Sequence, residues 1–462
     1  MWEDSDDPPP PGGSAEWVGS GSFRVDRRKA LEKLSEYGLP DPDDFLLPLA
    51  RAAVATGAQR LHLRQTPEGV ELRFDGRPFS AAELKNPYGY FLEGDATPAQ
   101  RHLGMGLLSA LRIPSVSVEI DSGIGPERLR LRVESIETEG VSPLEEAEEA
   151  TVLHVRRGDR RGLERALGRV SDSCAMSPAQ VWVNGMRIAP LSPEEREPEV
   201  CLTEEGTRLC LRVPPLTPGA SSGASDIELY VFGVRVDKGI QSPLRTQVHA
   251  LVNDDRLRLN ASDSAVVEDE RLRRCLHLLK NGCRELIPVA AQALRLRLPE
   301  VWRRLTLVPK LQTSWGERIE GRARDSERPD EPGSSILGAF KTPLFLRERP
   351  LLDLERESLA WELRAMSWLR KLCWRRFPDL TRVVDGRILR ELWSSPVYLS
   401  CGGTSLSLAD IDELQRRQGR VPYSTARDPR QVVCVEPKRV IWIVSKKELG
   451  PLAQRYTLED VR

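Results

Sequence analysis

The order of hydrophobic patterns between residues 45 and 155 limits the fold of this chain more than any other feature of its sequence. An apolar run with helical spacing extends from Phe45 to Ala58, behind two aspartates that suit a helix N-terminus. Arg60 to Arg64 and Val70 to Phe74 then alternate across a Pro-Glu-Gly turn, which predicts a hairpin. A second helix-like run and three further predicted strands follow, at 101–111, 115–120, 129–133 and 152–155. This order predicts an α+β fold, with helices covering one face of a mixed sheet.

Length and composition limit the number of domains and the classes of protein. At 462 residues the chain is too long for one ordinary core, so we expect two or three domains. Its 68 basic residues nearly cancel 69 acidic ones, which removes the electrostatic reason to expect a nucleic-acid partner. No apolar run is long enough for a membrane span and no signal peptide is recognisable, so we expect a cytoplasmic protein without a membrane partner. The eight cysteines lack metal-ligand spacing, which predicts reduced thiols and no metal site.

Segments rich in proline, glycine and charge divide the chain. They lie at 189–199, 214–225 and 312–335. We therefore predict a disordered tail at 1–22, an α+β domain at 23–190, an α/β unit at 191–311, a linker or long loop at 312–335 and a C-terminal α/β unit at 336–462. Within the later units we expect strands at 227–236, 248–259, 432–435 and 440–444 and helices at 268–280, 284–298 and 351–374, with Ser407 and Asp410 forming a capping box for a further helix that ends near Gly419.

Two short patterns are candidates for nucleotide chemistry. Gly104-Met105-Gly106 is expected at the mouth of a helix, where backbone N–H groups approach a phosphate and the helix dipole favours negative charge. Asp75, followed by Gly76 at a strand end, carries a carboxylate able to accept a hydrogen bond from an adenine amine. The plainer alternatives are a tight turn before a core helix and an ordinary Asp-Gly turn. Each pattern alone is weak.

Taken in order, these segments resemble the N-terminal domain of the ninety-kilodalton heat-shock chaperones, members of the Bergerat-fold (GHKL) ATPase superfamily. The first helix, the loop from Asp75 to Phe79 and the run from Arg101 to Leu111 match that family's helix, DNGIGM loop and GxFGVGFYSAF run. The match continues into the family's middle domain, at Leu229 to Val231 and at Leu257 to Ser262. The resemblance implies a Bergerat-type two-layer sandwich followed by a region like the chaperone middle domain. The part from about 298 to 393 matches poorly, and there is no room for the family's dimerisation domain.

This sequence departs from the family at the positions that act on ATP. Where the family has a glutamate that orients water and an asparagine that holds magnesium, this chain has Pro48 and Ala52, which can do neither. Arg77 and Phe79 replace small glycines, and Arg101 replaces the first glycine of the phosphate loop. Asp263 stands where the family has an arginine that reaches the γ-phosphate. These changes predict a pseudo-ATPase with no catalytic residue and no magnesium, although Arg101 leaves open weak binding of ATP or ADP.

The degenerate nucleotide-binding candidates are therefore Asp75, Gly76, Arg101, Gly104, Met105 and Gly106. Three functions remain open: a chaperone-like protein that binds clients or partners without efficient ATP hydrolysis, a non-catalytic scaffold or regulatory module of a bacterial signalling or defence system, and an unconventional weak ATPase. Fold resemblance alone does not decide between them. The five isolated histidines are expected to be structural, and the tryptophans at 361, 368 and 374 are expected to form a core stripe, unless they form an exposed partner-binding face.

Overall fold

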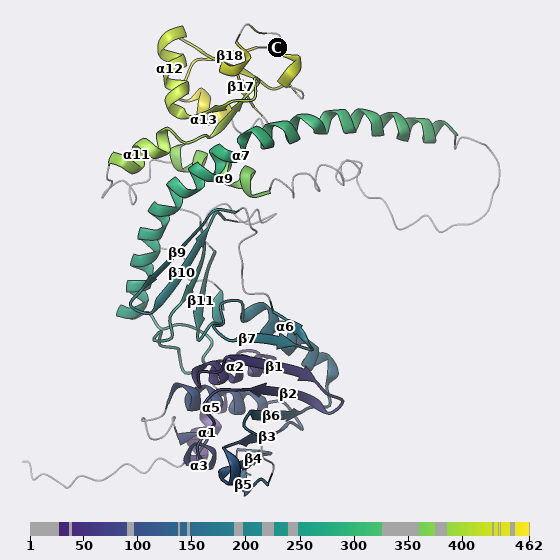
Figure 1. Cartoon of the computed structure of the whole chain (residues 1–462), viewed down its shortest axis with the longest axis vertical. Coiled ribbons are helices and arrows are strands. Elements are labelled where there is room, and N and C mark those ends of the chain that lie inside the picture. Colours follow the sequence, from purple (N-terminus) through teal and green to yellow (C-terminus); the bar gives the residue numbers. More distant parts are fainter. Residues whose placement is uncertain are drawn as a thin grey trace, which may run out of the picture.

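The structure is a computed structural model. It describes residues 27–36, 39–89, 97–136, 139–145, 148–188, 197–214, 226–238, 248–325, 360–374, 386–426, 429–432, 434, 436–443 and 449–461. Three β-sheets follow one another along the chain, each with helices beside it (Figure 1). We call residues 27–188 the first unit, 197–325 the second unit and 360–461 the third unit. The predicted tail at 1–22 lies outside the described residues, and the predicted domain boundaries stay predictions.

The first unit is built around an eight-stranded mixed sheet with the strand order β5-β4-β3-β6-β2-β1-β7-β8. Only β1 and β7 pair in parallel within it. Its strands are β1 (Arg60–Gln65), β2 (Gly69–Phe74), β3 (Ser117–Ser122), β4 (Leu129–Val133), β5 (Glu139–Pro143), β6 (Thr151–Arg156), β7 (Gln180–Val183) and β8 (Met186–Arg187). Its helices are α1 (Arg27–Glu36), α2 (Leu46–Ala55), α3 (Ala81–Lys85), α5 (Pro98–Leu111) and α6 (Arg160–Ser173), with short 3-10 turns η1 (Pro42–Phe45) and η2 (Gly125–Glu127).

Alternating side chains explain why helices cover this sheet on one face. In β1, Leu61 and Leu63 are buried, whereas Arg60, His62 and Arg64 between them are exposed. Helix α2 packs against both α5 and α6, and α5 and α6 in turn pack against strands of the sheet. Their apolar side chains and those of the sheet form one core. The predicted α+β class is thereby confirmed.

The second unit has a five-stranded sheet ordered β12-β11-β13-β10-β9 and a very long helix, α7 (Glu270–Asp325). The strands are β9 (Glu199–Glu204), β10 (Thr207–Arg212), β11 (Asp226–Val231), β12 (Val234–Lys238) and β13 (His249–Asn253). The single strand expected at 227–236 is in fact a hairpin, because Phe232 and Gly233 adopt positive φ angles of 52° and 68° and turn the chain.

Helix α7 corrects two predictions. The helices expected at 268–280 and 284–298 are one helix. Gly282, which the sequence suggested as a break between them, instead lets the helix approach β10 closely, since an ideal Cβ there would lie 2.3 Å from Leu211 Cδ1. The linker or long loop expected at 312–335 is helical in its described part, as far as Asp325. The rest of that predicted linker lies outside the described residues.

The third unit contains α9 (Ala360–Trp374) and α11 (Gly386–Trp393), which pack on α7. Its sheet is ordered β15-β14-β17-β16-β18. The remaining elements are β14 (Tyr398–Ser400), β15 (Ser405–Leu406), α12 (Leu408–Gln418), β16 (Val421–Ser424), η4 (Pro429–Gln431), η5 (Pro437–Arg439), β17 (Ile441–Trp442), α13 (Leu449–Ala453) and β18 (Leu458–Asp460). The capping box of Ser407 and Asp410 is confirmed, and Gly419 ends the helix with a φ of 72°.

Apolar side chains of the second and third units form one continuous core along α7. Trp361 and Trp368 are buried in that core at 4% and 3% exposure, and Trp374 packs at its edge, which confirms the core stripe. Figure 1 shows α7 passing from the second sheet to the third unit on a bent path. None of the helices in the described ranges has the length and apolar character needed to cross a bilayer.

Candidate functional site

The two glycines of the Gly104-Met105-Gly106 pattern lie inside α5 and not at its mouth. The helix begins at Pro98, and the side chain of Thr97 caps it by accepting a hydrogen bond from the N–H of Gln100 at 3.2 Å. Gly104 and Gly106 are therefore in the second and third turns, where backbone N–H groups donate to the preceding turn. The expectation that this pattern opens a helix is wrong, because the helical part of the chain extends six residues further toward the N-terminus. Inside a helix these amides are not available to a phosphate.

Gly106 instead allows α5 to pack directly on α2. An ideal Cβ at Gly106 would lie 2.4 Å from Leu49 Cδ2 and 2.6 Å from Leu49 Cγ, so only glycine fits without rearrangement. Pro48 and Ala52, one residue before and three residues after Leu49 on α2, are buried as well. The positions at which the family resemblance implies a water-orienting acid and a magnesium ligand are thus occupied by apolar side chains in a packed helix interface.

Asp75 stabilises the start of the hairpin. Its Oδ1 accepts hydrogen bonds from the backbone N–H groups of Gln59 and Arg60, each at 2.8 Å, and its Oδ2 accepts one from Arg60 Nε at 2.8 Å. Burial raises the pKa of this carboxyl, but the hydrogen bonds from Arg60 and Gln59 outweigh burial and lower it. Gly76 lies against the end of α2, where a Cβ would be 2.0 Å from Thr56 Oγ1. Both residues therefore have structural roles at the start of the hairpin.

Arg101 points to the second unit and forms part of a buried charge cluster. Its Nη2 lies 3.2 Å from Asp263 Oδ1 and donates to the carbonyl of Leu259 at 3.3 Å. The neighbouring His102 places Nδ1 at 2.8 Å from Asp263 Oδ2. Arg51 on α2 completes the set, with Nη1 at 4.0 Å from Asp263 Oδ2. We call Arg51, Arg101, His102 and Asp263 the junction cluster, because it joins two helices of the first unit to a loop of the second.

The loop that carries Asp263 is organised by Asn260. The Asn260 Oδ1 atom accepts hydrogen bonds from the backbone N–H groups of Ser264 and Ala265 at 3.0 and 3.2 Å, and from Ser262 Oγ at 3.1 Å. Asp263 N–H donates to the Asn260 carbonyl at 3.1 Å. Asp263 has a φ of 52°, a conformation that aspartate and asparagine tolerate better than most residues. The loop thus holds one carboxylate, fully buried at 0% exposure, against α2 and α5.

Arg51 ties the first unit to two parts of the second. Its guanidinium is 1% exposed, and its Nη2 donates to the Arg235 carbonyl on β12 at 3.0 Å while Nη1 donates to the Asp263 carbonyl at 3.3 Å. No hydrogen-bond partner faces its Nε among the residues that the structure describes. Burial lowers the pKa of Arg51, and the charge of Asp263 opposes that shift. A guanidinium keeps its proton in proteins, so the cluster holds a buried positive charge here.

Burial and the neighbouring charges also shift the pKa values of Asp263 and His102. Burial raises the pKa of Asp263, but the hydrogen bond and charge of His102 and the charges of both arginines lower it overall. Burial lowers the pKa of His102, and although Asp263 opposes this, Arg51 and Arg101 add to it. At neutral pH the imidazole is therefore uncharged, and because an ionised carboxylate only accepts, Nδ1 carries the proton. Two guanidinium charges face one carboxylate charge.

Apolar and backbone contacts surround the cluster and close the junction. The ring of Phe232, in the β11–β12 turn, meets the His102 ring edge to face with centroids 5.6 Å apart. At the next residue, an ideal Cβ on Gly233 would lie 2.3 Å from the Cα of Ser177 in the first unit. Val234 contributes to the core of the first unit. The two units therefore touch through packed surfaces, with the junction cluster between them.

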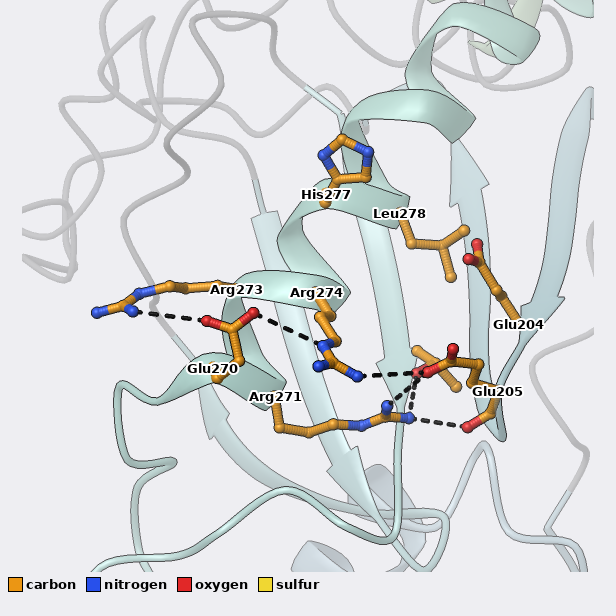
Figure 2. A pocket seen from close by; sticks show the side chains of 9 residues that line it. Glu204, Glu205, Glu270, Arg271, Arg273, Arg274, His277 and Leu278 are labelled. Atoms are coloured by element: carbon orange, nitrogen blue, oxygen red, sulfur yellow. Dashed lines mark hydrogen bonds and ion pairs between the residues drawn. The ribbon is translucent and has the colours of Figure 1, made fainter.

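A separate cavity of about 430 Å³ lies between the β9–β10 turn and the first turns of α7 (Figure 2). Its arginines are already paired: Arg271 donates to the Glu205 carbonyl at 2.9 Å and lies 3.5 Å from Glu205 Oε2, and Arg273 and Arg274 lie 3.7 and 3.6 Å from Glu270. Three glutamates balance the three arginines that line this cavity. Its cations therefore serve the local fold rather than offer an uncompensated phosphate site.

Sequence reasoning missed a pair of thiols. Cys201 and Cys210 are directly opposite on β9 and β10, and their sulfur atoms are 2.7 Å apart. Glu199 lies near both, but its Oε1 accepts a hydrogen bond from Arg212 Nε at 2.8 Å. Burial, together with Cys210 and Glu199, raises the pKa of Cys201 to about 12, so the Cys201 thiol stays protonated at neutral pH. Their separation of nine positions became informative only once the hairpin register was known.

The histidines other than His102 lie in separate places. His62 stacks on Trp182 with ring centroids 4.3 Å apart, and His154 and His249 lie 4.0 and 3.6 Å from glutamates on neighbouring strands. His277 lines the cavity of Figure 2. The structure therefore brings only one of the five histidines into the junction cluster.

Comparison with known proteins adds evidence of structural likeness. No model of a known protein family matches the sequence, and no curated protein matches it. Among solved structures, the ATPase and transducer domains of DNA topoisomerase II from Balamuthia mandrillaris are similar to part of this chain, with 11% sequence identity and a TM-score of 0.38. That match covers 52% of this chain and 83% of the other. Membership of the heat-shock chaperone family stays a prediction.

Proposed function

We propose that this chain is a cytoplasmic pseudo-ATPase that resembles the N-terminal and middle domains of a heat-shock chaperone and binds client or partner proteins without efficient ATP hydrolysis. The direct packing of α2 on α5, with Leu49 against Gly106, is the observation that carries the proposal. The resemblance places the catalytic groups of an active ATPase on this stretch of α2. Here that stretch is a closed apolar interface.

The chemistry of hydrolysis supports the same view. Activating a water molecule requires a base within hydrogen-bond reach, and magnesium requires oxygen ligands. Pro48 and Ala52 provide neither, and Asp263 places a negative charge where the resemblance implies an arginine for the γ-phosphate. We propose that magnesium has no site here and that any binding of ATP or ADP is weak. We propose no nucleic-acid or membrane partner.

A scaffold or regulatory module is the second candidate, and the junction cluster favours it. A chaperone clamp depends on movement between its parts, whereas this cluster ties the first unit to the second through buried contacts between residues of the chain itself. A protein with two fixed units presents one constant surface to a partner. The third candidate, an unconventional weak ATPase, is the one that the first experiment tests.

Purified protein should release no phosphate above blank in the presence of magnesium and ATP, and ATP or ADP should raise its melting temperature little or not at all, because weak binding to the native state gives little stabilisation. An Arg101→Gln variant is the matched control, since a nucleotide shift that survives this substitution does not come from the candidate site. Magnesium-dependent turnover that Arg101→Gln abolishes would refute the proposal.

A second pair of assays separates the two remaining candidates. A chaperone-like protein suppresses aggregation of an unfolded model protein, and its failure to do so at several-fold excess would count against that function. A scaffold retains a specific partner in a pull-down without nucleotide. Loss of that partner on nucleotide removal would count against the scaffold.

A further inference from the structure

We propose that the junction cluster is an anion-binding site whose resident ligand is the chain's own Asp263 carboxylate, and that an inorganic oxyanion of phosphate type takes its place when this carboxylate is removed. The inference rests on the proposed function and deepens it, because it gives a role to the residue that departs most strongly from an ATP-dependent enzyme. Asp263 then occupies, as part of the chain, the place that an anionic ligand would take.

The contacts of Asp263 are those of a bound anion. One carboxylate oxygen is 2.8 Å from His102 Nδ1, and the other is 3.2 Å from Arg101 Nη2. Arg51 faces the same carboxylate at 4.0 Å from the side of α2. All three positive or donating groups belong to the first unit, whereas the carboxylate comes from the second unit. The first unit thus supplies the site and the second unit supplies the ligand.

The surroundings make this site sensitive to loss of its anion. Arg51 and His102 are 1% and 3% exposed, so water replaces little of what Asp263 provides. A buried guanidinium left without a counter-charge is strongly unfavourable. Among the described residues, the other carboxylate whose charge acts on Arg51 is Asp44, and Asp44 is already paired with Arg169. Among the described residues, loss of Asp263 therefore leaves the buried Arg51 without an unpaired carboxylate nearby, and an anion from solution can supply the missing charge.

The donor set selects the class of anion. Guanidinium groups present planar, parallel N–H donors that match the oxygens of carboxylates and phosphates, and they bind such anions more strongly than they bind chloride. A neutral His102 adds one N–H donor directed at an oxygen. We therefore choose inorganic phosphate as the probe and chloride at equal ionic strength as its reference.

Two variants open the site, and one keeps it filled. Asp263→Gly removes the carboxylate and suits the φ of 52°, and Asp263→Ser removes the charge with a smaller loss of volume. Asp263→Asn is the matched control, because it keeps the size and tolerates this φ but fills the space with a neutral amide. Each opening variant is also combined with Arg101→Gln in a double variant, which removes one donor of the site. Any rise in stability that the double variant still shows measures the general stabilisation of proteins by phosphate.

The assay is the melting temperature of the full chain against phosphate concentration at constant ionic strength. For Asp263→Gly or Asp263→Ser we expect a saturable rise of about 3 °C or more over chloride. The wild type, Asp263→Asn and the double variants should lack the saturable part. If an opening variant does not fold in chloride, its soluble recovery in phosphate relative to its double variant gives the same comparison.

The inference is overturned if neither opening variant responds to phosphate, whether by melting temperature or by soluble recovery. It is also overturned if the double variants respond equally, because the effect would then be independent of Arg101. This failure differs from failure of the proposed function. ATP turnover by the wild type would refute the pseudo-ATPase and leave the phosphate result unchanged.

Discussion

Replacing Gly106 with alanine tests the closed interface between α2 and α5. Two effects act on this variant in opposite directions. Alanine is favoured over glycine in a helix interior by about 1 kcal/mol. The new methyl group, however, would lie 2.4 Å from Leu49 Cδ2 and 3.3 Å from the Leu49 backbone nitrogen, and overpacking of this kind costs about 1–3 kcal/mol. We therefore expect Gly106→Ala to lower the free energy of unfolding by up to about 2 kcal/mol.

Gly168 provides the matched control. It lies in the interior of α6, is exposed, and has no atom within 4 Å of an ideal Cβ. Gly168→Ala should therefore show only the helix-propensity gain and raise the free energy of unfolding by about 0.5–1 kcal/mol. The sign of the effect thus differs between two substitutions that are chemically identical.

Leu49→Ala completes a double-mutant cycle. Leu49 is 1% exposed, so its truncation alone should cost about 2–5 kcal/mol. In the double variant the methyl group at residue 106 enters the space that Leu49 leaves. The loss of stability in the double variant should therefore be smaller, by about 1–3 kcal/mol, than the sum of the losses in the two single variants. Urea unfolding followed by far-UV circular dichroism measures these differences, provided that the m values agree. If Gly106→Ala stabilises the chain as much as Gly168→Ala does, the two helices are not in contact there and the reasoning fails.

Three other expectations follow from buried or paired groups. Burial lowers the pKa of His102 below its ordinary 6.5, so the folded state binds a proton less readily than the unfolded state. The free energy of unfolding should then fall as the pH drops below about 6.5, and it should fall by up to about 1.4 kcal/mol per pH unit more in the wild type than in His102→Asn. Urea unfolding at several pH values measures both slopes, and equal slopes would contradict this expectation. Asp43 is 7% exposed and pairs at 2.7 Å with both Arg157 and Arg165, so Asp43→Ala should lower the free energy of unfolding by about 3–5 kcal/mol. Glu164→Ala, which breaks an exposed pair, should lower it by at most about 0.5 kcal/mol. Similar losses for the two variants in thermal unfolding would refute this distinction. A thiol oxidant such as diamide should link Cys201 to Cys210 and so remove two titratable thiols, and this reaction should become faster as the pH rises toward the raised pKa of Cys201. Cys201→Ser should prevent this loss, whereas Cys373→Ser should not. If the wild type loses no thiols, the pairing is wrong.

Local patterns predicted the elements that depend on neighbouring residues. The hairpin of β1 and β2 follows from alternating side chains around a short turn, and the capping box at Ser407 follows from side chains three positions apart. The tryptophans at 361 and 368 lie on the buried face that their spacing indicated. In each case the stabilising contacts join residues close in the chain, so a short window of sequence contains the necessary information.

Patterns with more than one local solution were interpreted less well. Gly104 and Gly106 suit the mouth of a helix and also a close contact between helices, and the choice depends on Leu49, far away in the sequence. Gly282 suits a helix break and also close packing on a strand. The hairpin between β11 and β12 depends on a positive φ at Phe232, and phenylalanine is not a residue type that predicts a turn. The deciding contact is tertiary in the first two cases.

The sequence by itself determined that Pro48 and Ala52 cannot activate water or hold magnesium, since that conclusion depends only on the chemistry of their side chains. It also determined that residue 263 is acidic where the resemblance implies a base. Only the tertiary structure decided what that acid does, because Asp263 meets Arg101 and His102 across more than 160 residues of chain. A carboxylate is repelled by a phosphate and stabilised by two arginines, and the fold determines which of these it faces.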